Sequence, residues 1–485
     1  MGRWEWKRWD FALLLGLMLG MGILAGKFSV AAAASPAVAI QAQGAAAEPG
    51  KPVSQSLAAE DKSPVSSEKD ASYLTAAVVS LASYGDDRSL LAREWLKDAG
   101  WSLSGQETVS SVAEGRFHLV RKVLADGKQL MLLSFPGTER RKDIEVDFKT
   151  RRVPFGGRNP QEFAIAAAGK GQGLPMVHKG FDDYTMTALF TEPSAALSGK
   201  TAGEDLAAEL LANPQERLCL TGHSLGGAAA TLAAARLADM GVPREQLQVI
   251  TFGAPAVGDE AFARRYETRF QLTRVVMEGD PVAGALQSLS RRFVQFGEKV
   301  RWRPNRNSDR FAHQMVVYLD DALRLYYDAT PEGTPTPLMA HKAKVLPSGL
   351  YLASPVLALD DRLTSDDAYL RRALMESLVM QYTPVLLAQQ DADTALPLLI
   401  AAARAADCQT VLLIHLRAEA SRTQAGAYRL ILAEELYDLA GHLLMMQSHS
   451  MTTHDVTPLE AASCLQFLGR EGRDRALGLT GSGHS

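Results

Sequence analysis

Short apolar runs alternate with longer segments of helical periodicity in the middle of the chain. A helix predicted over Gly227–Met240 follows the run RLCLTG, a second over Asp259–Phe270 follows LQVITFG, and a further apolar run, LTRVVMEGD, comes next. Strands this apolar are buried on both faces, and their alternation with helices is typical of a mostly parallel sheet. We therefore predict an α/β fold with an open central sheet.

Two helices and a hairpin are predicted ahead of these units. Residues 70–100 carry apolar side chains at helical spacing, with Asp70 as a helix N-cap and Gly100 as a C-cap. Further on, the pair Asp126-Gly127 separates two β-rich runs, which is a strong hairpin signal. The second run, Leu130 to Phe135, is nearly all apolar and is therefore expected to be a central strand.

The pattern changes beyond about Asp328. Residues 330–337, TPEGTPTP, mark a break, and the chain from Thr364 to Leu477 is rich in alanine and leucine. Within it, the segment YRLILAEELYDLAGHLLMMQ places several residues on a turn-based period, namely Leu430, Glu434, Leu436, Leu439 and Leu443. We predict a C-terminal all-helical region of four or five helices, without a repeat of fixed period.

The first 34 residues have the layout of a secretory signal peptide. Arg3, Lys7 and Arg8 precede the apolar run from Phe11 to Gly26, and small residues follow up to Ala34. An uncleaved anchor, in which Lys27 reaches the membrane surface, is the alternative. No cysteine follows the run as a lipoprotein site would require. We expect an exported protein: periplasmic, extracellular or membrane-anchored and facing outside the cytoplasm.

Composition adds bounds to this picture. The chain has 485 residues, a net charge of −4 and 47% hydrophobic residues, which indicates a large globular core and argues against nucleic-acid binding. Three widely spaced cysteines indicate neither a disulfide framework nor a metal site. Together the patterns divide the chain into six segments: 1–34 signal peptide or N-terminal anchor, 35–67 flexible linker, 68–328 α/β domain, 329–363 connecting segment, 364–477 helical C-terminal region, and 478–485 disordered tail.

Ser224 is a candidate nucleophile because it lies in Gly-His-Ser-Leu-Gly between an apolar run and an alanine-rich one. A sharp strand-to-helix turn exposes such a serine and leaves no room for side chains two positions away, where this chain has Gly222 and Gly226. The same pentapeptide also occurs by chance, so a glycine-rich turn with an incidental serine is the alternative. The strand before it and the helix of small residues after it favour the nucleophile.

Serine needs a base to remove its proton, and the base needs an acid to orient it. Asp280 directly follows LTRVVM, at the end of a strand where an open α/β sheet forms its crevice. Asp259 competes, although it stands where a helix begins and fits a capping role. His313 is the first histidine after Asp280, with His341 as second choice. His223 is expected to point away from Ser224 and to be structural.

Two donors are needed for the oxyanion that forms on the substrate. One is the backbone N–H of Leu225, which follows the serine. The other is expected from the loop after an earlier strand, Phe135-Pro136-Gly137-Thr138, in which Gly137 allows close approach and Thr138 adds a hydroxyl.

These segments, in chain order, resemble the class 3 (fungal-type) triacylglycerol lipases of the α/β-hydrolase superfamily. The similar segments are SFPGT, VHKGFDDY, TGHSLGGAAA, FGAPAVGD, RVVMEGDPV and AHQMVVYL. The resemblance covers about residues 70–325. It implies Ser224 as nucleophile, Asp280 as acid, His313 as base and Thr138 with Leu225 as oxyanion hole. It implies no metal or organic cofactor, and it assigns His178 no catalytic role.

Two segments depart from the family pattern. Gln295 stands where many members have a histidine that is not the base, and the segment after Thr138, expected to be a lid, is charged, with only Ile144, Val146 and Phe148 as a clear apolar set. A lid that lies on lipid exposes an apolar face. Smaller or more polar esters, or phospholipids approached through the basic residues 140–142, therefore stay open as substrates.

We expect an exported serine hydrolase that cleaves carboxylic esters of lipids through a Ser-Asp-His triad. The alternatives are a phospholipase A1 or a short-chain carboxylesterase. A hypothesis of another class is an envelope or membrane binding protein that uses the helical tail, with the hydrolase core as a scaffold. The expected partner is a lipid or other ester, with contact to a membrane or lipid surface and none to nucleic acid.

Overall fold

The computed structural model describes residues 64–479, except for 86–89, 112, 125–126, 138–150, 170–172, 192–199, 285–291, 305–311, 331–342, 389–391, 393, 424–425 and 454–455. Several predicted features therefore lie outside the described residues. They are the signal peptide, most of the linker, residues 480–485, His341, Thr138 and the lid segment up to Thr150. The described chain begins with helix α2, Pro64–Ala82, so residues 64–67 belong to a helix and not to the linker.

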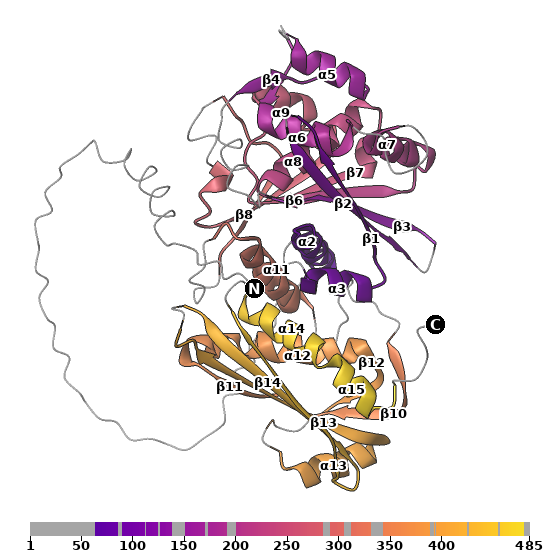
Figure 1. Cartoon of the computed structure of the whole chain (residues 1–485), viewed down its shortest axis with the longest axis vertical. Coiled ribbons are helices and arrows are strands. Elements are labelled where there is room, and N and C mark those ends of the chain that lie inside the picture. Colours follow the sequence, from indigo (N-terminus) through magenta and orange to yellow (C-terminus); the bar gives the residue numbers. More distant parts are fainter. Residues whose placement is uncertain are drawn as a thin grey trace, which may run out of the picture. The chain divides into compact units, whose positions relative to one another are not determined.

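A seven-stranded sheet, of order β1-β2-β3-β6-β7-β8-β9, forms the centre of the first part of the chain (Figure 1). The first three strands are antiparallel, and β3, β6, β7, β8 and β9 run parallel to one another. The strands are β1 Ser102–Val109, β2 Glu114–Val123, β3 Gln129–Phe135, β6 Arg217–His223, β7 Leu247–Phe252, β8 Gln271–Met277 and β9 Glu298–Trp302. The mostly parallel sheet predicted from the sequence is confirmed.

The predicted hairpin is present as β2 and β3, which pair antiparallel from Val123↔Gln129 to His118↔Ser134. Strand β3 is central, as expected, because it lies between β2 and β6 and its residues 131–135 are buried. A short antiparallel pair, β4 Arg152–Pro154 with β5 Met176–His178, lies outside the main sheet.

Helices cover both faces of this sheet because successive residues of a strand point to opposite sides. On β3, Leu132 packs with α2, α3 (Leu90–Asp98) and α11 (Met315–Ala329), while Leu133 packs with helices on the other face. Those other helices are α5 Pro160–Ala168, α6 Lys179–Leu189, α7 Ala202–Ala212, α8 Leu225–Asp239 and α9 Glu260–Tyr266.

Of the two predicted helix ends, the start at Asp70 is wrong and the end at Gly100 is confirmed. Asp70 is not an N-cap, because α2 begins six residues earlier, at Pro64. Gly100 follows α3 with a φ of +73°, and the N–H of Trp101 donates to the carbonyl of Leu96. This is the left-handed helix ending that glycine makes easy.

The C-terminal prediction is wrong, because a second sheet occupies this part of the chain. Its six strands are β10 Lys344–Leu352, β11 Val356–Leu359, β12 Tyr382–Leu387, β13 Cys408–Ala420, β14 Tyr428–Asp438 and β15 Leu443–Thr452. The order is β12-β10-β13-β14-β15, with β11 also paired to β13. Residues 364–477 are therefore not all-helical, and 329–363 is more than a connection, because β10 and β11 belong to the sheet.

The prediction failed because the composition of this segment favours a helix while its buried positions follow the period of a strand. The buried residues of β14 recur at every second position, Leu430, Leu432, Glu434 and Leu436, and this is the period of a strand with one face on a core. The leucine, alanine and glutamate content of the segment favours helix instead, and pairing with β13 and β15 overrides that preference. Four helices do occur in the region: α12 Asp367–Gln381, α13 Leu396–Ala405, α14 Pro458–Leu468 and α15 Arg470–Ala476.

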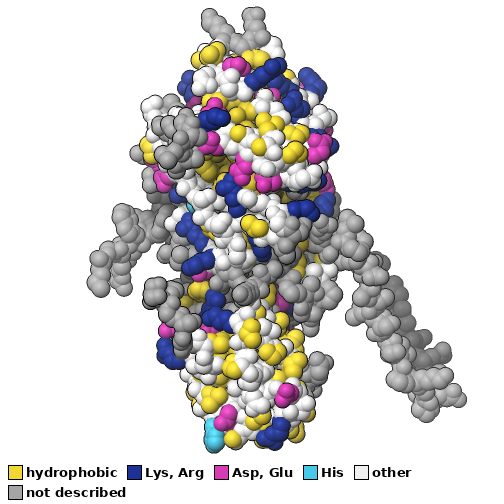
Figure 2. Space-filling model, turned by 90° about the vertical axis from the view of Figure 1, so that its right-hand side faces the viewer, with side chains coloured by type: hydrophobic (Ala, Val, Ile, Leu, Met, Phe, Trp, Pro, Cys, Tyr) yellow, Lys and Arg dark blue, Asp and Glu magenta, His cyan; other side chains and the backbone are white. Residues whose placement is uncertain are grey.

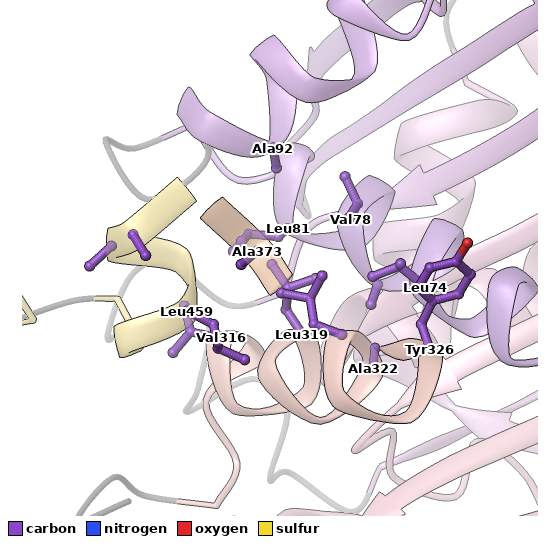
Figure 3. Packing of buried hydrophobic residues seen from close by; sticks show 14 of the residues in the cluster. Leu74, Val78, Leu81, Ala92, Val316, Leu319, Ala322, Tyr326, Ala373 and Leu459 are labelled. Carbon is purple, nitrogen blue, oxygen red and sulfur yellow. The ribbon is translucent and has the colours of Figure 1, made fainter. Parts of the chain in front are cut away.

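One hydrophobic core connects the two sheets. It contains residues of α2 and α11 together with residues of α12, α14 and the second sheet, and Figure 3 shows Leu74, Val316, Ala373 and Leu459 among them. Polar contacts add to it, because Arg324 of α11 pairs with Asp366 at 3.0 Å. The C-terminal part is therefore packed against the first part through its own apolar side chains.

Candidate active site

Ser224 occupies the turn between β6 and α8. Its φ of +56° and ψ of −123° place it in a region that residues with side chains rarely adopt. A Cβ atom at Gly222 would lie 2.4 Å from the carbonyl carbon of Gly226, and one at Gly226 would lie 2.0 Å from the carbonyl oxygen of Phe135. Both glycines are therefore required by space, and the backbone strain at Ser224 is of the kind that functional sites retain.

Three of the side chains predicted from the sequence meet at this turn. His313, just before α11, has its Nε2 atom 2.9 Å from Oγ of Ser224 and its Nδ1 atom 2.9 Å from Oδ2 of Asp280. The Asp280 side chain is fully buried, and that of His313 is 14% exposed. Because an ionised carboxylate only accepts, Nδ1 carries the hydrogen and Nε2 is left to accept the serine proton.

Asp280 is held ionised by the groups around it. Burial alone raises the pKa of a carboxyl, but here hydrogen bonds from His313, from the hydroxyl of Tyr318 at 2.6 Å and from the N–H of Val282 at 2.8 Å lower the pKa below its ordinary value. Tyr318 was not among the side chains predicted for the site. Its position in AHQMVVYL, five residues after His313, was the available signal.

The competing residues have other positions. Asp259 caps helix α9, where its Oδ1 atom accepts the N–H of Phe262 at 3.0 Å, as its place in the sequence suggested. His223 does not point at Ser224 but contacts Tyr84 and the backbone of His313. Gln295 donates to the carbonyls of Ala254 and Ala283, at 3.2 and 3.3 Å.

The oxyanion prediction is covered in part by the described residues. Leu225 is the first residue of α8, where a backbone N–H has no acceptor within its own helix. Its amide therefore stands beside Ser224 at the positive end of the helix. Thr138 lies outside the described residues, whereas Gly137 before it is buried.

Helix α8 is anchored at its far end by a buried ion pair. The Arg236 guanidinium lies 2.8 Å from Oδ1 of Asp182 in α6 and donates to the carbonyl of Gly156 at 3.0 Å. Its central carbon is 3.6 Å from the ring centre of Phe155 and 4.3 Å from that of Phe163. Removal of one partner would leave a buried charge, so this pair fixes the helix that begins at Ser224.

Among the described residues, the thiols of Cys219 and Cys464 are not candidate nucleophiles. Burial raises the pKa of the Cys219 and Cys464 thiols to about 12, so both stay protonated near neutral pH. Within the described ranges, no three His, Cys, Asp or Glu side chains are arranged to hold a metal ion.

On the face drawn in Figure 2, basic and acidic side chains are intermixed with apolar ones and do not form a large patch of one charge. Among the helices that the structure describes, none is both long and apolar enough to cross a membrane.

Comparison with a family model covers Ser224 and Asp280 and ends before His313. Residues 132–288 match the family model of Lipase (class 3). The chain is 47% identical to secreted mono- and diacylglycerol lipase 1 of Fusarium solani over 87 residues, which are 18% of this chain and 22% of that protein. It is 31% identical to phospholipase A1-Igamma1, chloroplastic, of Arabidopsis thaliana over 209 residues, which are 40% of this chain and 38% of that protein.

Among solved structures, the lipase from Rhizopus microsporus var. chinensis aligns with 20% identity and a TM-score of 0.36, over 50% of this chain and 76% of that one. The chain matches 22% of the fungal relative and 38% of the plant relative, so it spans less than two fifths of the length of either. The resemblance expected from the sequence is confirmed over the matched segment, because residues 132–288 match the family model of Lipase (class 3).

Proposed function

We propose that this chain is an exported serine hydrolase that cleaves carboxylic esters of lipids. The observation that carries the proposal is the continuous contact from Ser224 through His313 to Asp280, both steps at 2.9 Å, on a strained strand-to-helix turn. When a serine lies on a sharp turn and is hydrogen-bonded to a histidine of fixed orientation, its hydroxyl is activated for acyl transfer.

The reaction would proceed through an acyl-enzyme. Nε2 of His313 accepts the Ser224 proton while Oγ attacks the ester carbonyl, and Asp280 stabilises the imidazolium that forms. The carbonyl oxygen becomes an anion that the N–H of Leu225 stabilises, with Thr138 as the proposed second donor. His313 then gives its proton to the departing alcohol, and a water activated by the same histidine releases the acid. No step requires a metal or an organic cofactor.

The substrate class is proposed from the relatives. The two curated relatives are named as a mono- and diacylglycerol lipase and a phospholipase A1, and both names refer to esters of glycerolipids. Export is proposed from the signal-like first 34 residues and agrees with the word "secreted" in the fungal relative's name. A lipid surface outside the cytoplasm is the expected partner.

Replacing Ser224 by alanine tests the catalytic assignment. We expect a loss of at least about 10³-fold in kcat for p-nitrophenyl butyrate, because a triad without its nucleophile retains only residual catalysis. A fluorophosphonate probe should label the wild-type protein at Ser224 and leave the Ser224→Ala variant unlabelled. Circular dichroism checks that the variant is folded. Turnover within a few-fold of wild type would refute the assignment.

A substrate panel separates the remaining classes. Short-chain esters, long-chain triacylglycerols and diacyl phospholipids would each be assayed below and above the concentration at which the lipid aggregates. Release of the sn-1 acyl chain from phospholipid at the highest kcat/KM would favour the phospholipase A1 activity. Activity confined to dissolved short-chain esters would favour a carboxylesterase.

A further inference from the structure

Tyr84 and His223, the residue before Ser224, form a hydrogen-bonded pair. The hydroxyl of Tyr84, which follows helix α2, lies 2.6 Å from Nδ1 of His223, and Nε2 of His223 lies 2.6 Å from the backbone carbonyl oxygen of His313. Both side chains are buried, at 7% and 6% exposure. The two histidine rings lie close, with centres 4.5 Å apart.

The direction of these hydrogen bonds follows from the groups involved. A carbonyl oxygen only accepts, so Nε2 of His223 carries its hydrogen and donates to His313. In neutral imidazole the other nitrogen is then an acceptor, so the Tyr84 hydroxyl donates to Nδ1. A donating Tyr84 hydroxyl therefore matches a His223 ring that carries its hydrogen on Nε2, the nitrogen that holds the His313 backbone.

The same pair also contacts the segment that precedes Thr138. A Cβ atom on Gly137 would lie 2.2 Å from the Tyr84 hydroxyl oxygen, 2.8 Å from the carbonyl oxygen of His223 and 3.2 Å from its Nδ1 atom. Only glycine fits at that distance. Three segments therefore meet at this pair: the end of β3, the end of β6 with the serine, and the loop that carries the base.

We propose that Tyr84 and His223 are positioning residues of this active site. This proposal rests on the ester hydrolysis proposed above. His223 fixes the backbone of His313 so that the base reaches Ser224, and Tyr84 acts through His223. Tyr84 lies before the matched family segment, which begins at residue 132, so the helix that leads into the domain supplies part of the active site.

Kinetics of four variants of the full chain test the proposal, with kcat for p-nitrophenyl butyrate calculated per serine labelled by the fluorophosphonate probe. Tyr84→Phe should lower kcat about 10-fold and His223→Leu about 100-fold, each with KM within about two-fold of wild type. The double variant should lose no more than His223→Leu alone, because residues that act in series are not additive. His223→Gln, which keeps a donor and an acceptor, should retain kcat within about 10-fold of wild type.

The matched control is Tyr266→Phe. Its hydroxyl also makes a 2.6 Å hydrogen bond, to Asp239, but at the other end of α8, where Asp239 lies about 22 Å from Ser224 at 1.5 Å per residue. We expect its kcat to equal that of wild type. Wild-type kcat in Tyr84→Phe, or multiplied losses in the double variant, would overturn the inference and leave the proposed function intact. A wild-type protein that neither turns over the ester nor labels at Ser224 would instead refute the proposed function, and the inference with it.

Discussion

The hydroxyl of Tyr318 donates to Oδ2 of Asp280 at 2.6 Å, the same oxygen that accepts from His313. Tyr318 is fully buried in α11, and its oxygen also accepts the N–H of Met277 at 3.0 Å. The residue thus connects the end of β8, the acid and the helix after the base. Burial and the negative charge of Asp280 raise the pKa of Tyr318 well above its ordinary value, so the hydroxyl keeps its hydrogen and stays a donor.

Tyr318→Phe should weaken catalysis most at low pH. The donors around Asp280 hold its pKa below the ordinary value, so loss of one donor raises that pKa and the carboxylate is protonated at a higher pH. We expect kcat to fall about 10-fold and the acid limb of the plot of kcat against pH to shift to higher pH. Tyr369→Phe, which removes an exposed hydroxyl bonded to Asp328, is the control. An unchanged acid limb would contradict the role of Tyr318.

Asp280→Asn should lower kcat by about 10³–10⁴-fold, because an amide no longer selects the imidazole form with hydrogen on Nδ1. Asp259→Ala is the matched test of the competing carboxylate. Since Asp259 caps α9, we expect an unchanged kcat and a loss of about 1 kcal/mol in the free energy of unfolding, measured by denaturant titration. The reverse pattern, with kcat lost in Asp259→Ala alone, would exchange the two roles.

Asp321 should make the protein less stable as the pH rises. Burial, and next the charge of Asp320, raise the pKa of Asp321 from 3.8 to about 7, while Arg324 lowers it. Between these two values the folded protein holds a proton that the unfolded chain has released, so stability falls as pH increases through that window and levels off above 7. A pKa change of this size corresponds to about 4 kcal/mol.

The variant Asp321→Asn removes this titration, so its melting temperature should exceed that of wild type at pH 8 and approach it near pH 4. Glu278→Gln, which removes an exposed carboxylate, controls for net charge and should leave the wild-type dependence unchanged. Parallel curves for wild type and Asp321→Asn between pH 4 and 8 would contradict the prediction.

Deletion of the residues after Thr330 should give an insoluble protein. The removed part contributes Leu370 and Leu374 to the core that includes α2 and α11, and Arg372 donates to the Thr330 carbonyl at 2.7 Å. Without them α11, which follows His313, would expose apolar side chains. The soluble fraction after expression is the measurement. A soluble, fully active truncated enzyme would show that the C-terminal part is a separate module.

The sequence by itself determined the residues of the candidate site and the fold around them. Ser224, Asp280 and His313 could be chosen because each follows a strand or precedes a helix in a fixed order, and local signals such as Gly222, Gly226 and Asp126-Gly127 report backbone geometry directly. These features depend on neighbours in the chain, which sequence patterns record.

Tertiary structure decided the rest. The segment from Tyr428 became a strand because β13 and β15 pair with it on either side, and its leucines alone did not distinguish period two from helical spacing. The roles of Tyr84 and Tyr318 likewise depend on partners 139 and 38 residues away. Strand pairing and buried hydrogen bonds join residues distant in the chain, so they depend on partners that a local sequence pattern does not specify.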